Sequence, residues 1–208
     1  MADNRKMWED LGMDLQTHDM LCAVLPQAFG DVFLSQGNRP DGMDYFNMVV
    51  ADIHGIRPAE LVEFQKKGGK VVGSFCIHVP DEVVVAGGAI ATGLCSGSQF
   101  WVPGGEKVLP TATCPLIKAS LGARFDRTCP FFRICDLFTG ETTCDGKKKA
   151  WEILAEDAPM YIMDIPQMKR PEDYEKWSKE IKNYIKRIEE LTGNTITAQS
   201  LKEAIVLL

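Results

Sequence analysis

The segment CDLFTGETTCDGKKKAWEILAEDAPMYIMDI, residues 135–165, decides the fold that the sequence predicts. It opens with an apolar stretch of strand character, continues with a helix-forming stretch from Asp145, and closes with a second apolar stretch of strand character. A strand, a helix and another strand in this order form a βαβ unit, whose strands are parallel. The segment therefore predicts an α/β fold with a parallel sheet that helices cover on both faces.

The same alternation extends towards the N-terminus. We predict strands in KVVGSFCIHV, residues 70–79, and in AIATGLC, residues 89–95. Helices are expected in PDEVVVAGGA, residues 80–89, and in CPLIKASLG, residues 114–122. The expected architecture is a doubly wound parallel sheet of about four strands, flavodoxin- or Rossmann-like.

Helical regions flank the predicted sheet. Residues 1–66 carry apolar residues at helical spacing, punctuated by proline and glycine, and should form an N-terminal helical region. Residues 67–170 should form the α/β domain that binds a cofactor. Residues 171–208 should form C-terminal helices, the first of them long and amphipathic.

Composition and charge exclude several classes of function. The chain has 208 residues and a formal net charge of −6, so it lacks the concentrated basic face that nucleic-acid binding requires. No segment approaches the roughly 20 consecutive apolar residues of a membrane helix. The charged N-terminus is unlike a secretory signal. We therefore expect a cytoplasmic protein with neither a nucleic-acid nor a membrane partner.

Seven cysteines in a cytoplasmic chain need an explanation. An odd number of cysteines and a reducing compartment both argue against a disulfide framework. The sequence contains no Cys-x-x-Cys pair of the kind found in zinc ribbons and thioredoxin-like sites. Three roles stay open: buried structural thiols, reactive thiols, or metal ligands that the fold gathers from separate loops.

Four of the cysteines occur where an open α/β sheet would place a ligand site, beyond the carboxyl ends of its strands. Cys95 and Cys144 follow predicted strands. Cys114 and Cys129 each precede a proline that can open a helix, and a helix N-terminus favours a thiolate. If all four loops share one rim of the sheet, they could ligate an iron–sulfur cluster. Buried thiols remain the alternative.

The other cysteines and the histidines are expected to be structural. Cys22 lies on an apolar helix face and Cys135 precedes a strand, so both should be core thiols. Cys76 stays open between a core thiol and a ligand. The histidines have no cysteine or carboxylate partner at catalytic spacing, which predicts structural roles for His18, His54 and His78.

Lys147, Lys148 and Lys149 fall in the first turn of a predicted helix that Asp145 would cap. The positive end of a helix dipole disfavours a nearby exposed cation by roughly 0.3–1 kcal/mol. A bound anion, either a cluster or a phosphorylated substrate, would account for the three lysines. The plain alternative is three solvated side chains.

Several stretches together resemble the 2-hydroxyacyl-CoA dehydratase family, that is, the 2-hydroxyglutaryl-CoA dehydratase D-component type. They are VPDEVVVAGGAIATGLCSGS, EKVLPTATCPLIKASLG, CPFF, GETTCDGKKKAWEIL and DIPQMKRPEDYEKW. Within that family they look closest to the double-cubane cluster proteins. The resemblance runs in collinear order along nearly the whole chain, which would correspond to the N-terminal half of a family subunit.

The resemblance implies two similar α/β domains with iron–sulfur clusters, of [4Fe–4S] or double-cubane type, held by cysteines between them. It implies general cluster ligands at Cys95 and Cys114, and ligands typical of the double-cubane branch at Cys129 and Cys144. Cys76 could also belong to the set. The partners that it implies are a separate ATP-hydrolysing activator and a second α/β domain or subunit, in a homo- or heterodimer.

The leading functional hypothesis is an iron–sulfur redox protein that performs low-potential one-electron reductions in an anaerobic cytoplasm. Lys147 to Lys149 would supply a positive field for the cluster or the substrate. One alternative is a 2-hydroxyacyl-CoA dehydratase subunit, a lyase that eliminates water, syn or anti, through a ketyl radical. The other is a non-catalytic fragment or electron-relay module.

Overall fold

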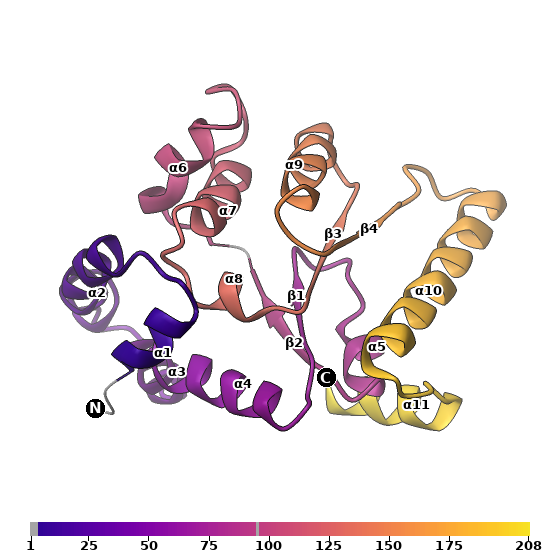
Figure 1. The fold of residues 1–208 in the computed structure, drawn as a ribbon, viewed down its shortest axis with the longest axis horizontal. Helices are drawn as coiled ribbons and strands as arrows, with labels where there is room; N and C mark the ends of the chain where they lie inside the picture. The colour runs from indigo at the N-terminus through magenta and orange to yellow at the C-terminus, as the bar shows by residue number, and fades with distance from the viewer. Residues whose placement is uncertain (1–3, 95) are drawn as a thin grey trace.

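A computed structural model describes residues 4–94 and 96–208 of the chain (Figure 1). Within these ranges, four parallel strands form one sheet in the order β2-β1-β3-β4. The strands are β1 (Val71–Ser74), β2 (Ile90–Gly93), β3 (Leu137–Glu141) and β4 (Met160–Met163). The predicted α/β fold with a parallel sheet of about four strands is confirmed.

The connections between the strands place helices on both faces of the sheet. β1 leads through α5 (Asp81–Ala86) to β2, whereas α7 (Pro115–Phe125) carries the chain back past β1 to β3. α9 (Asp145–Ala155) then joins β3 to β4. Right-handed crossovers in opposite directions put α5 on one face and both α7 and α9 on the other. Figure 1 shows this separation of the helices.

Each face of the sheet has its own apolar cluster, because successive side chains of a strand point to opposite faces. On the α7 and α9 face, Phe138 packs with Phe75 and Trp151, and the Phe75 and Trp151 rings are 4.4 Å apart. On the other face, the cluster joins the sheet to α5 and to the long helix α10 (Pro171–Thr192). The interior strands β1 and β3 are buried along their whole length.

Further helices extend the molecule at both ends of the chain. The N-terminal region contains α1 (Arg5–Asp10), α2 (Leu15–Phe29), the π-helical turn η1 (Gly30–Leu34), α3 (Met43–Ala51) and α4 (Ile56–Lys66). A third apolar cluster, which includes Leu61, Val71 and Ile134, attaches α4 to the sheet. At the C-terminal end, α10 ends at Gly193 in the left-handed conformation and α11 (Ala198–Leu207) follows. The predicted domain boundaries remain predictions.

The first strand is shorter than the sequence predicts. Strand character was expected over residues 70–79, but β1 ends at Ser74. The Phe75 backbone N–H still donates to the Thr139 carbonyl oxygen, at 2.9 Å. Cys76 then adopts a φ of 69°, in the left-handed region, and the chain leaves the sheet there. The turn brings Cys76 to the carboxyl end of β1.

Glycines bring α7 into backbone contact with the segment before it, which consists of η2 (Gln99–Trp101) and α6 (Val102–Glu106). A Cβ atom on Gly122 would lie only 1.9 Å from the Trp101 carbonyl oxygen. A Cβ atom on Gly105 would lie 2.0 Å from the carbonyl oxygen of Lys118. Backbone cannot move aside as a flexible side chain can, so this packing requires glycine at both positions.

We predict that Gly122→Ala lowers the free energy of unfolding by about 3 kcal/mol, because the added methyl group overpacks a backbone contact. Thermal unfolding followed by circular dichroism measures the change. Gly30→Ala is the matched control, since a Cβ atom there meets nothing within 4 Å. The control should change stability by no more than about 0.5 kcal/mol. Equal melting temperatures for Gly122→Ala and the wild type would contradict the contact.

Candidate functional site

The strand order identifies the edge of the sheet at which a ligand should bind. The chain leaves β1 in one direction and β3 in the other, so their carboxyl ends flank a topological switch point. Cys76 follows β1 at this point, and residues 142–144 follow β3. Ligands of open α/β sheets bind in the crevice outside such a switch point. The residues that line this edge therefore form the candidate site.

Cys114 and Cys144 occupy equivalent positions at two helix N-termini. Cys114 is the N-cap residue of α7 and Cys144 is the N-cap residue of α9. Both thiols are exposed, and neither side chain caps its own helix. Each thiol therefore stands at the positive end of an 11-residue helix whose first backbone N–H groups are not satisfied by the cap side chain.

The first turns of α7 and α9 pack against each other. A Cβ atom on Gly146 would lie 2.9 Å from Ile117 Cδ1 and 3.9 Å from Thr113 Cγ2. Gly146 is two residues after Cys144, and Thr113 is next to Cys114. The fold thus brings these two cysteine-bearing loops together, although they are far apart in the sequence.

Cys95 lies outside the described residues, but its neighbours can be placed. The Leu94 backbone N–H donates to the Ser74 carbonyl oxygen at 3.0 Å, at the carboxyl ends of β1 and β2. Ser96 Oγ is buried and is the side-chain polar atom for which the described part of the chain supplies no hydrogen-bond partner. A buried hydroxyl without a partner is costly, so Ser96 offers a hydrogen-bonding group at this edge.

Glu141 and Lys147 form an ion pair beneath the turn that carries Cys144. The Glu141 side chain is fully buried and the Lys147 side chain is 15% exposed. Glu141 also accepts a hydrogen bond from the Thr143 backbone N–H, at 2.8 Å. The Trp151 indole donates to the Glu141 carbonyl oxygen at 2.9 Å. These contacts fix the turn between β3 and α9.

The ion pair keeps both groups charged, although burial alone would favour their neutral forms. Burial alone would raise the pKa of Glu141, but the hydrogen bonds from Lys147 and Thr143 lower it below its usual range. Burial likewise opposes the Lys147 ammonium group, yet Glu141 raises the pKa of Lys147 overall. Lys147 also lies within hydrogen-bond reach of the Cys76 thiol. A permanent cation therefore stands between the ends of β1 and β3.

Each of the three adjacent lysines has a carboxylate partner within the chain. Lys147 pairs with Glu141, while the exposed Lys148 approaches Asp145 at 3.3 Å. The third, Lys149, is paired with Glu152 at 2.7 Å. Exposed pairs of this kind contribute about 0–1 kcal/mol and are screened by salt. The positive field that the sequence suggested is thus partly balanced locally, and its action on a ligand stays a prediction.

Comparison with known proteins identifies the family. The model of the family described as 2-hydroxyglutaryl-CoA dehydratase, D-component, matches residues 76–208. The chain belongs to this family. It is also 38% identical over 148 residues to the Escherichia coli (strain K12) protein named "Putative dehydratase subunit YjiM". That match covers 71% of this chain but only 39% of the relative, so the chain spans about two fifths of the relative's length.

Cys129 falls within the family match but does not lie at the switch point. It follows the C-terminal end of α7 and precedes α8 (Phe131–Ile134), so α7, of 11 residues and about 16 Å, separates it from Cys114. The expectation that all four predicted ligands share one rim is therefore wrong for Cys129. Its thiol is buried in the apolar cluster beside Phe132. Burial raises the pKa of Cys129 to about 11.

Cys135 has the structural role that the sequence suggested. Its thiol donates to the Phe131 carbonyl oxygen at 3.1 Å, and burial raises its pKa. Cys135 Sγ would also lie 2.8 Å from a Cβ atom at Gly73, which places the thiol tightly against β1.

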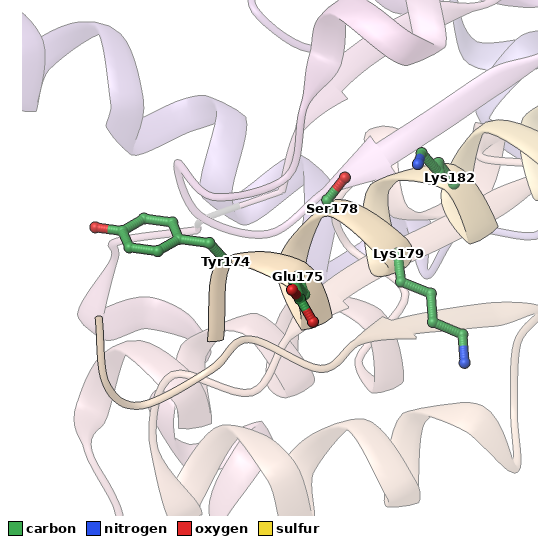
Figure 2. A pocket seen from close by; sticks show the side chains of 5 residues that line it. All are labelled: Tyr174, Glu175, Ser178, Lys179 and Lys182. Carbon is green, nitrogen blue, oxygen red and sulfur yellow. The ribbon is translucent and has the colours of Figure 1, made fainter. Parts of the chain in front are cut away.

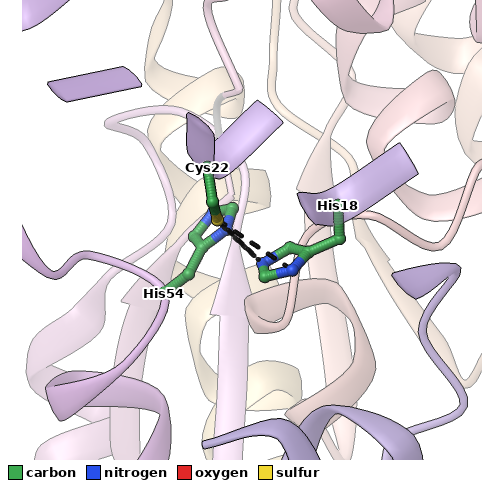
Figure 3. A group of neighbouring side chains, drawn as sticks. All are labelled: His18, Cys22 and His54. Atoms are coloured by element: carbon green, nitrogen blue, oxygen red, sulfur yellow. Dashed lines mark hydrogen bonds between the residues drawn. The ribbon is translucent and has the colours of Figure 1, made fainter. Parts of the chain in front are cut away.

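One group of side chains in the N-terminal helices was not predicted from the sequence. His18 Nε2 is 3.0 Å from His54 Nδ1, and Cys22 Sγ is 3.4 Å from His18 Nε2 (Figure 3). The signal that was available is the i,i+4 spacing of His18 and Cys22, which puts both on one helix face. His54 comes from a turn 32 residues after Cys22, and no local pattern predicts that approach.

The structure also has a surface hollow on α10. Figure 2 shows that its lining residues all come from the exposed side of that single helix: Tyr174, Glu175, Ser178, Lys179 and Lys182. No other element contributes a lining side chain to it in the described ranges, and it contains no cysteine or histidine.

None of the described helices, α10 included, has the length and apolar character that crossing a membrane would require.

We predict that Glu141→Gln lowers the free energy of unfolding by about 2 kcal/mol at neutral pH, because it leaves the Lys147 charge half-buried without its partner. The pKa of Glu141 is lowered from 4.5, so the wild type should hold this advantage above pH 4.5. The advantage should shrink as the pH falls through the lower, folded-state pKa. Urea unfolding between neutral and acidic pH measures the difference.

Glu152→Gln is the matched control for this experiment. It removes the carboxylate of an exposed pair with Lys149 and should cost less than about 1 kcal/mol at any pH. Equal effects of the two substitutions, or an effect of Glu141→Gln that does not diminish in acid, would contradict the assignment of a buried ion pair.

Proposed function

We propose that this chain is the iron–sulfur-binding part of a 2-hydroxyacyl-CoA dehydratase component. In this proposal Cys95, Cys114 and Cys144 ligate the cluster. The observation that carries the proposal is the approach of Cys114 and Cys144 at the packed N-termini of α7 and α9. Their exposed thiols stand beside the switch point of a chain that belongs to the dehydratase family.

The donor set at this edge fits an iron–sulfur cluster. Thiolates are the usual ligands of such clusters, and helix N-termini stabilise the negative charge that they carry. Ser96 Oγ supplies a hydroxyl that lacks a partner in the described part of the chain. Hydrogen bonds from such groups tune cluster potentials. When bound, the cluster would supply one-electron transfer at low potential.

The chain's own residues would hold the ligand loops in place. Lys147 and Glu141 fix the turn before Cys144. On the other loop, the buried Lys118 ammonium group donates to Glu106 at 2.6 Å and to the Thr111 carbonyl oxygen at 2.8 Å. With the contacts of Lys147 and Lys118 in place, Cys114 and Cys144 would bind the cluster without a large change of backbone conformation.

Two further cysteines complete the candidate ligand set. Cys76 is exposed at the carboxyl end of β1 and is within reach of Lys147, so its position supports a role as an additional ligand. Cys129 stays a predicted ligand on the resemblance alone, because it would have to leave an apolar cluster to join the others. Among Lys147, Lys148 and Lys149, the position of Lys147 best supports a role in stabilising a cluster thiolate, because it is within reach of Cys76.

The partners proposed for the chain follow from the family. A separate ATP-hydrolysing activator would deliver the electrons, and a second α/β domain or subunit would form the other wall of the site in a homo- or heterodimer. Exposed apolar side chains on α11 support such a contact: Ile205, Val206 and Leu207 are 59–80% exposed.

The name of the Escherichia coli relative favours dehydration as the reaction. Calorimetric titration with a 2-hydroxyacyl-CoA thioester tests this reaction. Binding of the thioester would favour a dehydratase, whereas no binding would favour a reductase of another substrate or an electron-relay module.

The proposed cofactor is tested by anaerobic purification followed by iron and acid-labile sulfide analysis and by EPR of the reduced protein. We expect iron and sulfide in comparable amounts and an iron–sulfur EPR signal after reduction. Protein that holds neither iron nor sulfide, even after anaerobic reconstitution, would show that the proposal is wrong.

We predict that Cys144→Ser lowers the bound iron by at least about half, because oxygen is a poorer ligand than thiolate for iron–sulfur clusters. The fold should persist, since Cys144 is exposed in a loop. Cys135→Ser is the matched control: its hydroxyl can still donate to the Phe131 carbonyl oxygen, and the iron content should not change. Wild-type iron content in Cys144→Ser would remove Cys144 from the ligand set.

A further inference from the structure

We propose that His18, Cys22 and His54 bind a single divalent transition-metal ion, with zinc as the ion that best suits this donor set. The site lies in the N-terminal helices and is separate from the proposed cluster site. All three residues also lie outside residues 76–208, the segment that matches the family model. The inference therefore does not depend on the iron–sulfur proposal.

The three donor atoms form a triangle of the size that a tetrahedral ion requires. His18 Nε2 and His54 Nδ1 are 3.0 Å apart, and Cys22 Sγ is 3.4 Å from the first and 4.0 Å from the second. Tetrahedral zinc, with Zn–N of about 2.0–2.1 Å and Zn–S of about 2.3 Å, sets ligand separations of about 3.3 Å and 3.6 Å. The observed triangle needs adjustments of only a few tenths of an ångström.

Surrounding residues hold the ligands in this arrangement. His18 and Cys22 lie one turn apart on α2, and His54 projects from the turn between α3 and α4 towards them (Figure 3). The Trp8 ring packs 4.4 Å from the His18 ring, and its indole donates to the His54 carbonyl oxygen at 2.9 Å. Trp8 of α1 thus contacts the ring of His18 and the backbone of His54.

A carboxylate lies close to the three donor atoms, where its negative charge favours a bound cation. Asp19 Oδ1 lies 3.8 Å from His18 Nδ1, the ring nitrogen that would not bind the metal.

A hydrogen bond between two structural histidines is the simpler alternative. It accounts for the 3.0 Å separation of the two nitrogens. It gives no reason for the Cys22 sulfur to approach both of the same nitrogens, at 3.4 and 4.0 Å. A neutral thiol can donate to only one of them, whereas a metal ion engages all three donor atoms at once.

Few apolar side chains are buried among those residues of the N-terminal helices whose burial is described. Of the residues from 4 to 55 whose burial is described, the buried hydrophobic side chains are Met13 and Leu21, and the buried polar ones are His18 and His54. Many large apolar side chains of this region are exposed instead, among them Met20, Val24, Val32, Phe33, Tyr45 and Phe46. A metal ion that links α2 to the turn before α4 would supply the stability that a small core cannot.

Cobalt(II) is the probe for this site, because it replaces zinc in tetrahedral sites and reports thiolate ligation by its absorption spectrum. The 208-residue chain, freed of metal with a chelator, is titrated with cobalt(II) in a reducing, anaerobic buffer. We expect a thiolate-to-cobalt charge-transfer band and strong visible bands that saturate at one equivalent and disappear on addition of zinc. A wild-type protein without these bands would overturn the proposal.

Variants assign the bands to this site. Cys22→Ser should abolish the charge-transfer band, whereas Cys144→Ser, which alters an exposed thiol at the other site, should keep it. His54→Gln should weaken cobalt binding by more than about tenfold, since even changes around metal ligands cost about 10–100-fold. This second variant decides the question if Cys22→Ser does not fold. A band that survives Cys22→Ser, or wild-type affinity in His54→Gln, would show that the metal binds elsewhere.

Discussion

The parallel pairing of β1 with β3 is the constraint on which the rest of the structure depends. It places Val72 opposite Leu137 at the centre of the sheet and aligns the carboxyl ends of the two strands. The connections to β2 and β4 then leave in opposite directions, which creates the switch point. α7 and α9 must both start at this edge and run back over the same face. The first turns of the two helices therefore pack together, and each has a cysteine as its N-cap residue.

Much of this could be predicted from local sequence patterns. Apolar runs alternating with helical periodicity predicted the four strands and the helices between them. Pro115 marked the start of α7, and with it the exposed position of Cys114. The same Cys-Pro pattern gave the wrong position for Cys129, because α8 begins on the return path, after the full length of α7. A proline marks a helix start but does not show which edge of the sheet that start faces.

The remaining features depend on contacts that local patterns do not encode. The three lysines of α9 suggested a bound anion, yet Lys147 turns back to Glu141, whose carboxylate is buried at the end of β3. Burial of that carboxylate follows from the packing of Trp151 and the turn around it. Likewise, His54 meets His18 only because the turn before α4 folds against α2. The histidine group therefore appeared only in the folded chain.

Cys114 and Cys144 lie in neighbouring loops at the carboxyl edge of the sheet, at the packed starts of α7 and α9. A short thiol-specific cross-linker applied to the native chain, followed by peptide mapping with mass spectrometry, tests it directly. We expect an intramolecular Cys114–Cys144 cross-link that is lost when the chain is unfolded in urea. We expect no link between Cys114 and the buried Cys129. A native chain in which Cys114 links to Cys129 but not to Cys144 would show that this placement of the two loops is wrong.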